Sequence, residues 1–300
     1  MLGQSLIDRI GHTPLLALGK AESGAELLAK AEWTNPGGSV KDRAAWSMLE
    51  AAERSGAMNA SRTLLEATSG NTGIALAMLC AARGYKVRLC LPENISPERR
   101  RILAAYGAEI TFTDPAESSD GAIRKAREIM AAEPDKYCYT DQYSNPANWQ
   151  AHYRTTAEEI WQQTEGRVTH FTATMGTSGT FIGTARRLKE LNPAIRCVSL
   201  QPDAAFHGLE GLKHMASAMV PAIYDPSVAD EDLGISTEAA YAAVRYLARK
   251  QGLLVGISAG AAWAGINLVA RRAPAGAVVV TVFADNADKY LSERVWQEGK

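Results

Sequence analysis

One lysine lies where its side-chain amine could take part in chemistry. Lys41 belongs to the segment NPGGSVKDR at 35–43, in which Ser39 has the side chain of a helix N-cap and a helical pattern continues to about Ser55. A cation in the first turn opposes the helix dipole by about 0.3–1 kcal/mol, which lowers the lysine pKa only slightly. A lowered pKa favours a lysine that acts as a neutral amine. From position alone, the other interpretation is a solvated lysine whose stem lies along the helix.

A turn rich in polar side chains follows the predicted strand at 63–68 and opens the predicted helix at 72–83. Small hydroxyl residues and free backbone N–H groups at a helix N-terminus can bind a carboxylate or a phosphate. The alternative is an ordinary capped turn, but four hydroxyl or amide side chains exceed what capping requires. The turn consists of Thr68, Ser69, Gly70, Asn71, Thr72 and Gly73.

A second turn of this kind lies in the other half of the chain, between the strand predicted at 170–175 and the helix predicted at 179–191. We interpret it as a second anion-binding turn. Its glycine spacing is not G-x-G-x-x-G, and the chain contains no G-x-x-x-x-G-K-[ST]. This disfavours a nicotinamide dehydrogenase and a P-loop NTPase. The turn consists of Gly176, Thr177, Ser178, Gly179 and Thr180.

A further turn, at 255–261, places Ser258 at the end of a predicted strand. On local grounds a simple helix cap explains this serine equally well.

The elements that must position these residues alternate between apolar runs and amphipathic stretches. This βαβα order predicts an α/β fold with parallel sheets covered by helices on both faces, where ligands lie beyond the carboxyl ends of the strands. Turn-rich 141–150 is the best candidate domain boundary. The strands are predicted at 27–33, 63–68, 86–92, 109–114, 170–175, 195–201, 253–258 and 277–284, and the helices at 40–55, 72–83, 97–106, 120–132, 179–191, 237–251 and 260–271.

The composition excludes several classes of protein. The 300 residues are 46% hydrophobic and carry a net charge of -1, so no global basic field exists to hold nucleic acid or an anionic membrane. The length favours two domains or one large α/β domain. The N-terminus lacks an apolar signal region and no run approaches twenty apolar residues, so we expect a cytoplasmic protein. The cysteines form no C-x-x-C pair that would indicate zinc, and we expect all of them to be reduced and structural: Cys80, Cys90, Cys138 and Cys197.

Taken together, four segments resemble the fold type II (β-family) pyridoxal-phosphate enzymes, and among them the O-acetylserine sulfhydrylases, or cysteine synthases. The segments are NPGGSVKDR, EATSGNTGIALAM, MGTSGT and GISAGA. The match follows the family's order from GHTPLL at residue 11 to DKYLS ending at residue 292. The segments ISPERRRILAAYGAEI, AHYRTTAEEIWQQT and THFTATMGTSGT are most similar to the B-type group, cysteine synthase B.

The resemblance implies two doubly wound α/β domains, as in the tryptophan synthase β-like fold. The smaller, substrate-binding domain would span 36–145, and the larger domain, which holds the cofactor phosphate, would combine 1–35 with 146–300. The implied reaction replaces the acetoxy or phospho group of O-acetylserine or O-phosphoserine by sulfide or thiosulfate through an α-aminoacrylate, giving cysteine or S-sulfocysteine.

The resemblance also implies residue roles. Lys41 would hold pyridoxal 5'-phosphate as a Schiff base and act as general base at the substrate Cα, while Ser258 would face the pyridine nitrogen. Asn71 would bind the cofactor's ring oxygen. The substrate carboxylate would be held by Thr68, Ser69, Asn71, Thr72 and Gln142, and the cofactor phosphate by Gly176, Thr177, Ser178, Gly179 and Thr180.

The chain departs from the family pattern at a few places. The segment 284–289 (ADNADK) replaces the common C-D-R-G-D-R, which leaves the pocket wall beside the cofactor ring open to question. At the mouth of the site, the B-type pattern tends to carry a basic pair, and Lys213-His214 occupy the corresponding positions. We hypothesise that Lys213 extends the substrate range to an anionic donor or leaving group; the alternative is a solvated surface lysine.

Other functions stay open at this point. A serine or threonine dehydratase, a threonine synthase or a cystathionine β-synthase would share Lys41 and the cofactor segments, although the whole-chain resemblance to the B-type group disfavours them. A non-catalytic small-ligand binder is a candidate from another class, which Lys41, Asn71 and Ser258 disfavour. The family implies a homodimer. Docking to serine acetyltransferase cannot be judged from the sequence.

Overall fold

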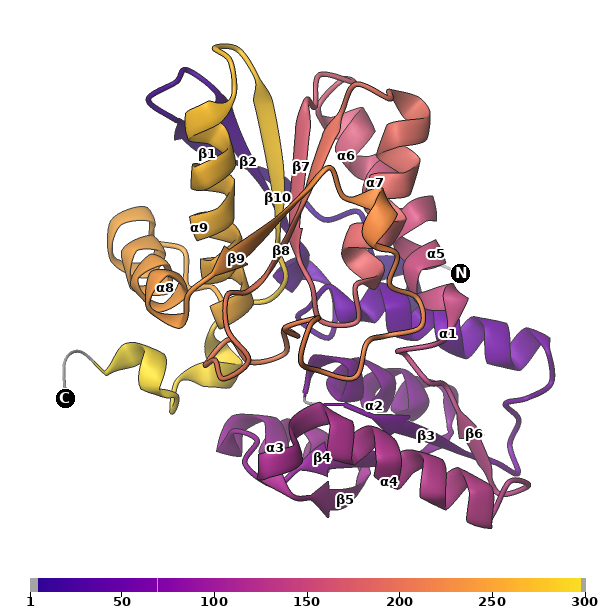
Figure 1. Ribbon diagram of the computed structural model, residues 1–300. Helices are drawn as coiled ribbons and strands as arrows, with labels where there is room; N and C mark the ends of the chain where they lie inside the picture. Colours follow the sequence, from indigo (N-terminus) through magenta and orange to yellow (C-terminus); the bar gives the residue numbers. More distant parts are fainter. Residues whose placement is uncertain (1–4, 69, 298–300) are drawn as a thin grey trace.

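The strands of the molecule form two separate sheets. The structure is a computed structural model that describes residues 5–68 and 70–297. Figure 1 shows the larger sheet in one half of the molecule and the smaller sheet in the other. The larger, six-stranded sheet has the order β1-β2-β10-β7-β8-β9, formed by Leu15–Lys20, Glu26–Ala31, Val278–Phe283, His170–Thr174, Arg196–Pro202 and Glu231–Ile235. The smaller, four-stranded sheet has the order β5-β4-β3-β6, formed by Glu109–Thr113, Lys86–Pro92, Thr63–Ala67 and Tyr137–Tyr139.

Helices connect the strands in both halves. Helix α1 (Lys41–Arg54) enters the part of the chain that builds the smaller sheet, followed by α2 Asn71–Arg83, α3 Pro97–Ala105 and α4 Ser118–Ala132. The remaining helices are α5 Pro146–Arg154, α6 Thr156–Gln163, α7 Gly179–Leu191, α8 Thr237–Gln251 and α9 Ile257–Arg272. Short 3-10 turns occupy Ile7–Arg9, Glu32–Thr34, Pro115–Glu117, Pro226–Val228, Asp288–Tyr290 and Arg294–Trp296.

Alternating side chains bury both faces of each sheet. In β10, Val279 packs into the core under α9, whereas Val278 and Val280 pack into the core under α6 and α7. In the smaller sheet, Leu64 packs toward α2 and Leu65 toward α4. Parallel strands that are covered on both faces read as continuous apolar runs, and β10 is fully buried along its length. Only the β1–β2 pair is antiparallel among the described pairs.

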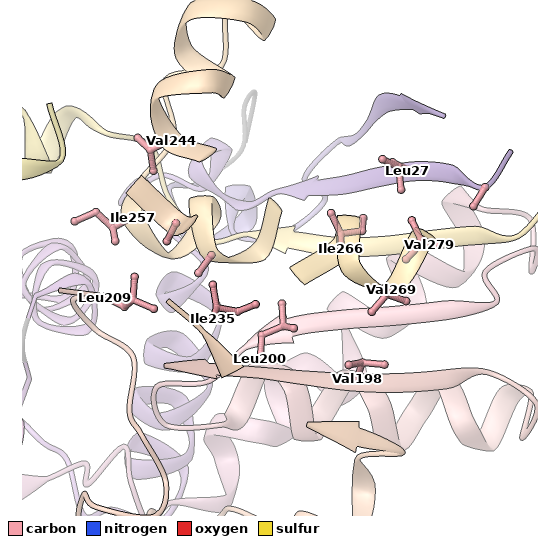
Figure 2. Packing of buried hydrophobic residues seen from close by; sticks show 14 of the residues in the cluster. Leu27, Val198, Leu200, Leu209, Ile235, Val244, Ile257, Ile266, Val269 and Val279 are labelled. Atoms are coloured by element: carbon pink, nitrogen blue, oxygen red, sulfur yellow. The ribbon is translucent and has the colours of Figure 1, made fainter. Parts of the chain in front are cut away.

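Helix α9 packs closely enough on its neighbours to require glycine. Figure 2 shows Ile266 and Val269 of α9 among the buried side chains of β8 and β10. A Cβ added at Gly260 would lie 2.4 Å from the Ala240 carbonyl of α8, and one at Gly265 would lie 2.4 Å from a methyl of Leu200. This packing fixes the N-terminal end of α9, where Ser258 lies.

The predicted α/β fold with mostly parallel, doubly covered sheets is confirmed, and the strands and helices that build it lie close to their predicted ranges, with one exception. The strand predicted at 253–258 is wrong. Gly252 ends α8 in the left-handed conformation, Val255 forms only an isolated bridge with Asn286, and α9 begins at Ile257. Within this run, Val255 is buried by packing with Phe283 and Leu247, Leu253 packs partly against the same cluster, and Leu254 is exposed.

Five elements were not predicted. Strands β1, β6 and β9 are short or expose much of their length, so they lack a clear apolar alternation. Helix α5 begins inside the predicted turn region at 141–150. Asn145 is its N-cap, accepting from the Ala147 N–H at 3.0 Å, and Pro146 occupies the first turn. Asn-Pro is thus a helix start here rather than only a turn signal. Helix α6 follows directly after Thr155.

Three further properties bear on the functional classes. No helix in the described ranges is long and apolar enough to cross a membrane. All four cysteines are buried and free, as expected. Within residues 5–68 and 70–297, no group of three or more His, Cys, Asp or Glu side chains could hold a metal ion.

Candidate active site

Predicted site residues from both halves of the chain line one cavity of about 780 Å³. Most of the predicted residues contribute to its wall: Lys41, Thr68, Asn71, Thr72, Gln142, Gly176, Thr177, Thr180, Lys213 and Ser258. Ser178 and Gly179 are buried in the same loop as Gly176. Ser69 lies outside the described residues. The carboxyl ends of β3 and β7, one from each sheet, therefore face a common space, as expected for α/β folds.

Lys41 is the first residue of α1 and is partly buried. The predicted N-cap role of Ser39 is wrong: Val40 occupies the N-cap position, and the Ser39 Oγ accepts from the Lys41 N–H at 3.2 Å. The Val40 N–H donates to the Ala284 carbonyl at 2.8 Å, and this contact fixes Val40, rather than Ser39, as the residue before the helix. Burial lowers the pKa of the Lys41 amine, and the nearby Asp285 carboxylate opposes this effect. Lys41 is thereby biased toward the neutral amine that reacts with a carbonyl group.

The turn after β3 is organised by side chains. The Gly70 N–H donates to the Thr68 Oγ1 at 3.0 Å, and the Thr72 Oγ1 donates to the Gln142 Oε1 at 2.7 Å. The Gln142 Nε2 in turn donates to the Ala67 carbonyl at 2.6 Å. Thr68, Thr72 and Gln142 are each at most 3% exposed. Gln142, which lies 70 residues from Thr72 in sequence, is therefore part of the same turn in space.

Asn71 at the start of α2 is held by a buried aspartate. Its Nδ2 donates to the Asp285 Oδ2 at 2.7 Å, and the Tyr290 hydroxyl donates to the same oxygen at 2.6 Å. Asp285 is fully buried, and its backbone carbonyl accepts from the Gly256 N–H at 3.0 Å. The sequence had pointed to 284–289 only as a departure from a pattern. Its alternation of Asp with small residues carried no signal for a central position in the site.

The loop after β7 is organised by its backbone. A Cβ added at Gly176 would lie 2.3 Å from the Gly211 carbonyl oxygen, so only glycine fits there. Ser178 adopts φ +71°, a left-handed conformation that is uncommon for a side-chain-bearing residue. Within the described chain, the N–H groups of Gly176, Thr177 and Ser178 have no backbone or side-chain acceptor. Three free donors at the N-terminus of α7 form a site for an anion.

Ser258 lies in the first turn of α9 and is 9% exposed. The turn that carries it is packed against the Asp285 carboxylate. A Cβ added at Gly256 would lie 2.1 Å from the Asp285 Oδ1. The close approach at Gly256 therefore fixes Ser258 relative to Ala284 and Asp285. These two residues also bond to Val40, next to Lys41, and to Asn71.

Lys213 is buried rather than solvated. Only 5% of its side chain is exposed, its Nζ lies 2.6 Å from the Asp120 Oδ1, and it lies over the ring of Tyr143. The neighbouring Glu210 pairs with Arg99 of α3. Both acidic–basic pairs connect the 203–221 segment with helices α3 and α4 of the smaller sheet, and all four residues line the cavity.

Several buried polar atoms in this site lack a protein partner. Among the described residues, they include the Asn71 Oδ1, the Ser178 Oγ and the Asp285 Oδ1. Buried polar atoms are rarely left unpaired, so these atoms fit a polar ligand. The donor set matches pyridoxal phosphate in particular: a lysine amine for its aldehyde, Asn71 for a ring substituent, Ser258 for a ring nitrogen and the loop at α7 for its phosphate. Fold and site together define an α/β protein with a polar cavity that fits a phosphorylated aldehyde cofactor.

Comparisons with known proteins agree with this class. Residues 6–285 match the family model described as pyridoxal-phosphate dependent enzyme. A cysteine synthase of Aquifex aeolicus is 47% identical, over 98% of this chain and 93% of the relative. Cysteine synthase B of Salmonella typhimurium is 43% identical, over 98% and 96% of the two chains. The solved O-acetylserine dependent cystathionine beta-synthase of Helicobacter pylori superposes with a TM-score of 0.92 at 36% identity, covering 99% of each chain. The chain belongs to the pyridoxal-phosphate dependent enzyme family, and pyridoxal phosphate is its cofactor.

Proposed function

We propose that this enzyme is a cysteine synthase, which replaces the acetoxy group of O-acetyl-L-serine by sulfide and releases L-cysteine and acetate. The observation that carries the proposal is the convergence of Lys41, the turn after β3 and the loop after β7 on one cavity. The full-length identity of 47% to a cysteine synthase supports the same reaction.

Lys41 holds the cofactor and moves the proton of the reaction. When bound, pyridoxal phosphate withdraws electrons from the substrate Cα and makes its proton acidic. The Lys41 amine, whose pKa is lowered by burial, takes this proton from Cα and later returns it to the same carbon. Ser258 would face the ring nitrogen with a neutral hydroxyl, which would accept or donate a hydrogen bond without fixing a charge there. Such a partner would leave the electron withdrawal moderate, which is sufficient for loss of a good leaving group from Cβ.

The turn after β3 holds the substrate carboxylate. Thr68, Ser69, Asn71, Thr72 and Gln142 are the residues that we propose for this role, and the loop of Gly176, Thr177, Ser178, Gly179 and Thr180 holds the cofactor phosphate. With the substrate carboxylate and the cofactor phosphate held by these two segments, the substrate Cα would lie within reach of Lys41. The Cβ–O bond then breaks, acetate leaves with the electron pair, and the sulfide sulfur forms the new bond to Cβ.

We propose, as an extension of this function, that the enzyme also uses thiosulfate as sulfur donor and O-phosphoserine as substrate. Thiosulfate or O-phosphoserine would bring a negative charge toward the mouth of the cavity, where Lys213 is the candidate partner. Because Lys213 is paired with Asp120, such an anion must compete with that carboxylate. If Lys213→Ala leaves the thiosulfate/sulfide and O-phosphoserine/O-acetylserine rate ratios unchanged, Lys213 has no part in this selectivity.

We also propose the domain boundaries, the oligomeric state and the cellular location of the protein. Residues 36–145 form a smaller substrate-binding domain, and 1–35 with 146–300 form the larger domain, which the separate sheets support. We further propose a homodimer in the cytoplasm.

The product assay tests the proposed function directly. The purified enzyme, loaded with pyridoxal phosphate, is supplied with O-acetyl-L-serine and sulfide, and L-cysteine is quantified by mass spectrometry. We expect cysteine in stoichiometric amount with acetate. Cystathionine synthesis is the second candidate, because the solved enzyme of Helicobacter pylori is named for it. Faster product formation with homocysteine than with sulfide would favour that candidate, and deamination of threonine alone would favour a dehydratase.

A further inference from the structure

Helix α5 places one amide behind both ligand-binding turns. Asn148 is 2% exposed, and its Nδ2 donates to two acceptors in different segments. One acceptor is the Thr177 Oγ1 at 3.0 Å, in the loop after β7, and the other is the Gln142 carbonyl at 2.7 Å. A single NH₂ group is therefore shared between the proposed phosphate loop and the residue that completes the turn after β3.

The connection continues from Gln142 into the proposed carboxylate-binding turn. The Gln142 side chain accepts from the Thr72 Oγ1 and donates to the Ala67 carbonyl. The path from Thr72 to Thr177 thus consists of buried hydrogen bonds through Gln142 and Asn148. It joins the ends of β3 and β7, which belong to different sheets.

The packing around Asn148 leaves its side chain little freedom. A Cβ added at Gly179 would lie 2.1 Å from the Asn148 Oδ1, so the first turn of α7 rests directly on the amide. One turn further along α5, the His152 Nε2 lies 3.3 Å from the Thr180 Oγ1. Burial lowers the pKa of His152 to about 3, which keeps its ring neutral beside the proposed phosphate site. A displacement of Asn148 must therefore shift the phosphate loop as well.

Few other side chains could make this connection. Aspartate has the same shape but lacks both donors and would bring a negative charge next to a phosphate. Leucine has a similar volume and would leave the Gln142 carbonyl and the Thr177 hydroxyl without this partner. Sequence reasoning missed Asn148, since α5 was not predicted.

We propose that Asn148 is a positioning residue that couples the substrate-carboxylate site to the cofactor-phosphate site. Occupation of either site then strengthens binding at the other, and the two effects are equal by linkage. This inference rests on the assignment of the two sites in the proposed function, but not on the identity of the sulfur donor or the leaving group.

The coupling is measured as cofactor affinity of the apo enzyme. Pyridoxal phosphate is titrated by its absorbance in the presence and absence of propionate, a carboxylate that has no amine to react with the cofactor aldehyde. For the unmodified enzyme we expect propionate to tighten cofactor binding several-fold. For Asn148→Ala and Asn148→Asp we expect cofactor affinity to fall roughly tenfold and the propionate effect to disappear.

Asn267→Ala is the matched control. The Asn267 Nδ2 donates only to the Trp263 carbonyl of its own helix among the described contacts, so we expect cofactor affinity and the propionate effect to stay unchanged. Asn148→Asp preserves the packing volume, and circular dichroism verifies that both Asn148 variants are folded. A propionate effect of unmodified size in folded Asn148→Ala and Asn148→Asp would overturn the proposal, as would its absence from the unmodified enzyme. Failure to make cysteine together with intact coupling would overturn the proposed function alone.

Discussion

The two ligand-binding turns share a position but not a construction. Each follows the carboxyl end of a parallel strand and opens a helix. The turn after β3 is held by hydroxyl and amide side chains that bond to Gln142 and Asp285. The loop after β7 offers backbone N–H groups, and its glycine at 176 is required by the Gly211 carbonyl.

This difference suggests separate roles for the two turns, one in substrate selectivity and one in binding of the cofactor phosphate. Side chains can be exchanged one at a time, so in its proposed role the turn after β3 would decide which substrate is held. Backbone donors are the same for any sequence that can adopt the loop conformation, so in its proposed role the loop after β7 would decide whether the cofactor phosphate is held at all. Lys41 belongs to neither turn, and its removal should have the largest effect.

Lys41→Ala should reduce the rate of cysteine formation by at least about a thousandfold, because it removes both the attachment of the cofactor and the base at Cα. The rate is measured with O-acetylserine and sulfide at saturating cofactor. Lys86→Ala, an exposed lysine on β4, is the control and should retain the unmodified rate. A Lys41→Ala enzyme within tenfold of the unmodified rate would contradict the assignment.

Gly176→Ala should weaken pyridoxal phosphate binding by more than about tenfold, because the new Cβ would meet a backbone oxygen that cannot move independently. Cofactor dissociation constants from absorbance titrations measure the effect. Thermal unfolding of the apo enzyme serves as the control for general destabilisation. An unchanged dissociation constant would show that the loop after β7 is not the phosphate site.

Thr72→Val should raise KM for O-acetylserine about tenfold or more, while cofactor affinity stays nearly constant. The substitution removes a hydroxyl that the carboxylate site uses and leaves the buried Gln142 Oε1 without its donor. Thr184→Val is the matched control, since the Thr184 Oγ1 is buried and has no partner among the described residues. Equal loss of cofactor affinity and substrate affinity in Thr72→Val would erase the distinction between the two turns.

Glu66→Gln should change the pH dependence of stability more than the activity. Glu66 accepts from the Thr140 hydroxyl at 2.6 Å and from the Gln142 N–H at 3.2 Å beneath the turn after β3. Burial raises the pKa of this carboxyl from 4.5 to about 8, so the folded protein binds the proton more tightly than the unfolded chain. Its contribution to the free energy of unfolding is full below pH 4.5 and falls by up to about 1.4 kcal/mol per pH unit as the pH rises toward 8.

Urea unfolding at pH 5.5 and pH 8 measures this contribution. The unmodified enzyme should lose more stability over the interval than Glu66→Gln, which carries no titratable group at this position. Identical losses in the two proteins would mean that Glu66 does not hold a proton in the folded state.

Residues with a local pattern could be predicted from the sequence. Both turns lie at strand-to-helix junctions that combine glycine with small polar residues, Lys41 and Ser258 lie in glycine-containing segments at the start of a helix, and residues of all four segments line the same cavity. Residues whose role depends on tertiary contacts could not be predicted. Asp285 and Asn148 reach the site from distant segments, and only the folded chain brings them to Asn71 and Thr177. The strand predicted at 253–258 failed for a related reason, because Val255 is buried by packing on Leu247 and Phe283 and forms only an isolated bridge with Asn286.

We propose that Lys41 binds the cofactor covalently between the two turns. Borohydride reduction of the pyridoxal-phosphate-loaded enzyme, followed by peptide mass spectrometry, tests it most directly, since reduction fixes a cofactor bound to a lysine. We expect one modified peptide, with the added mass on Lys41, and no modification in Lys41→Ala. Modification of another lysine in the unmodified enzyme, or of none, would contradict it.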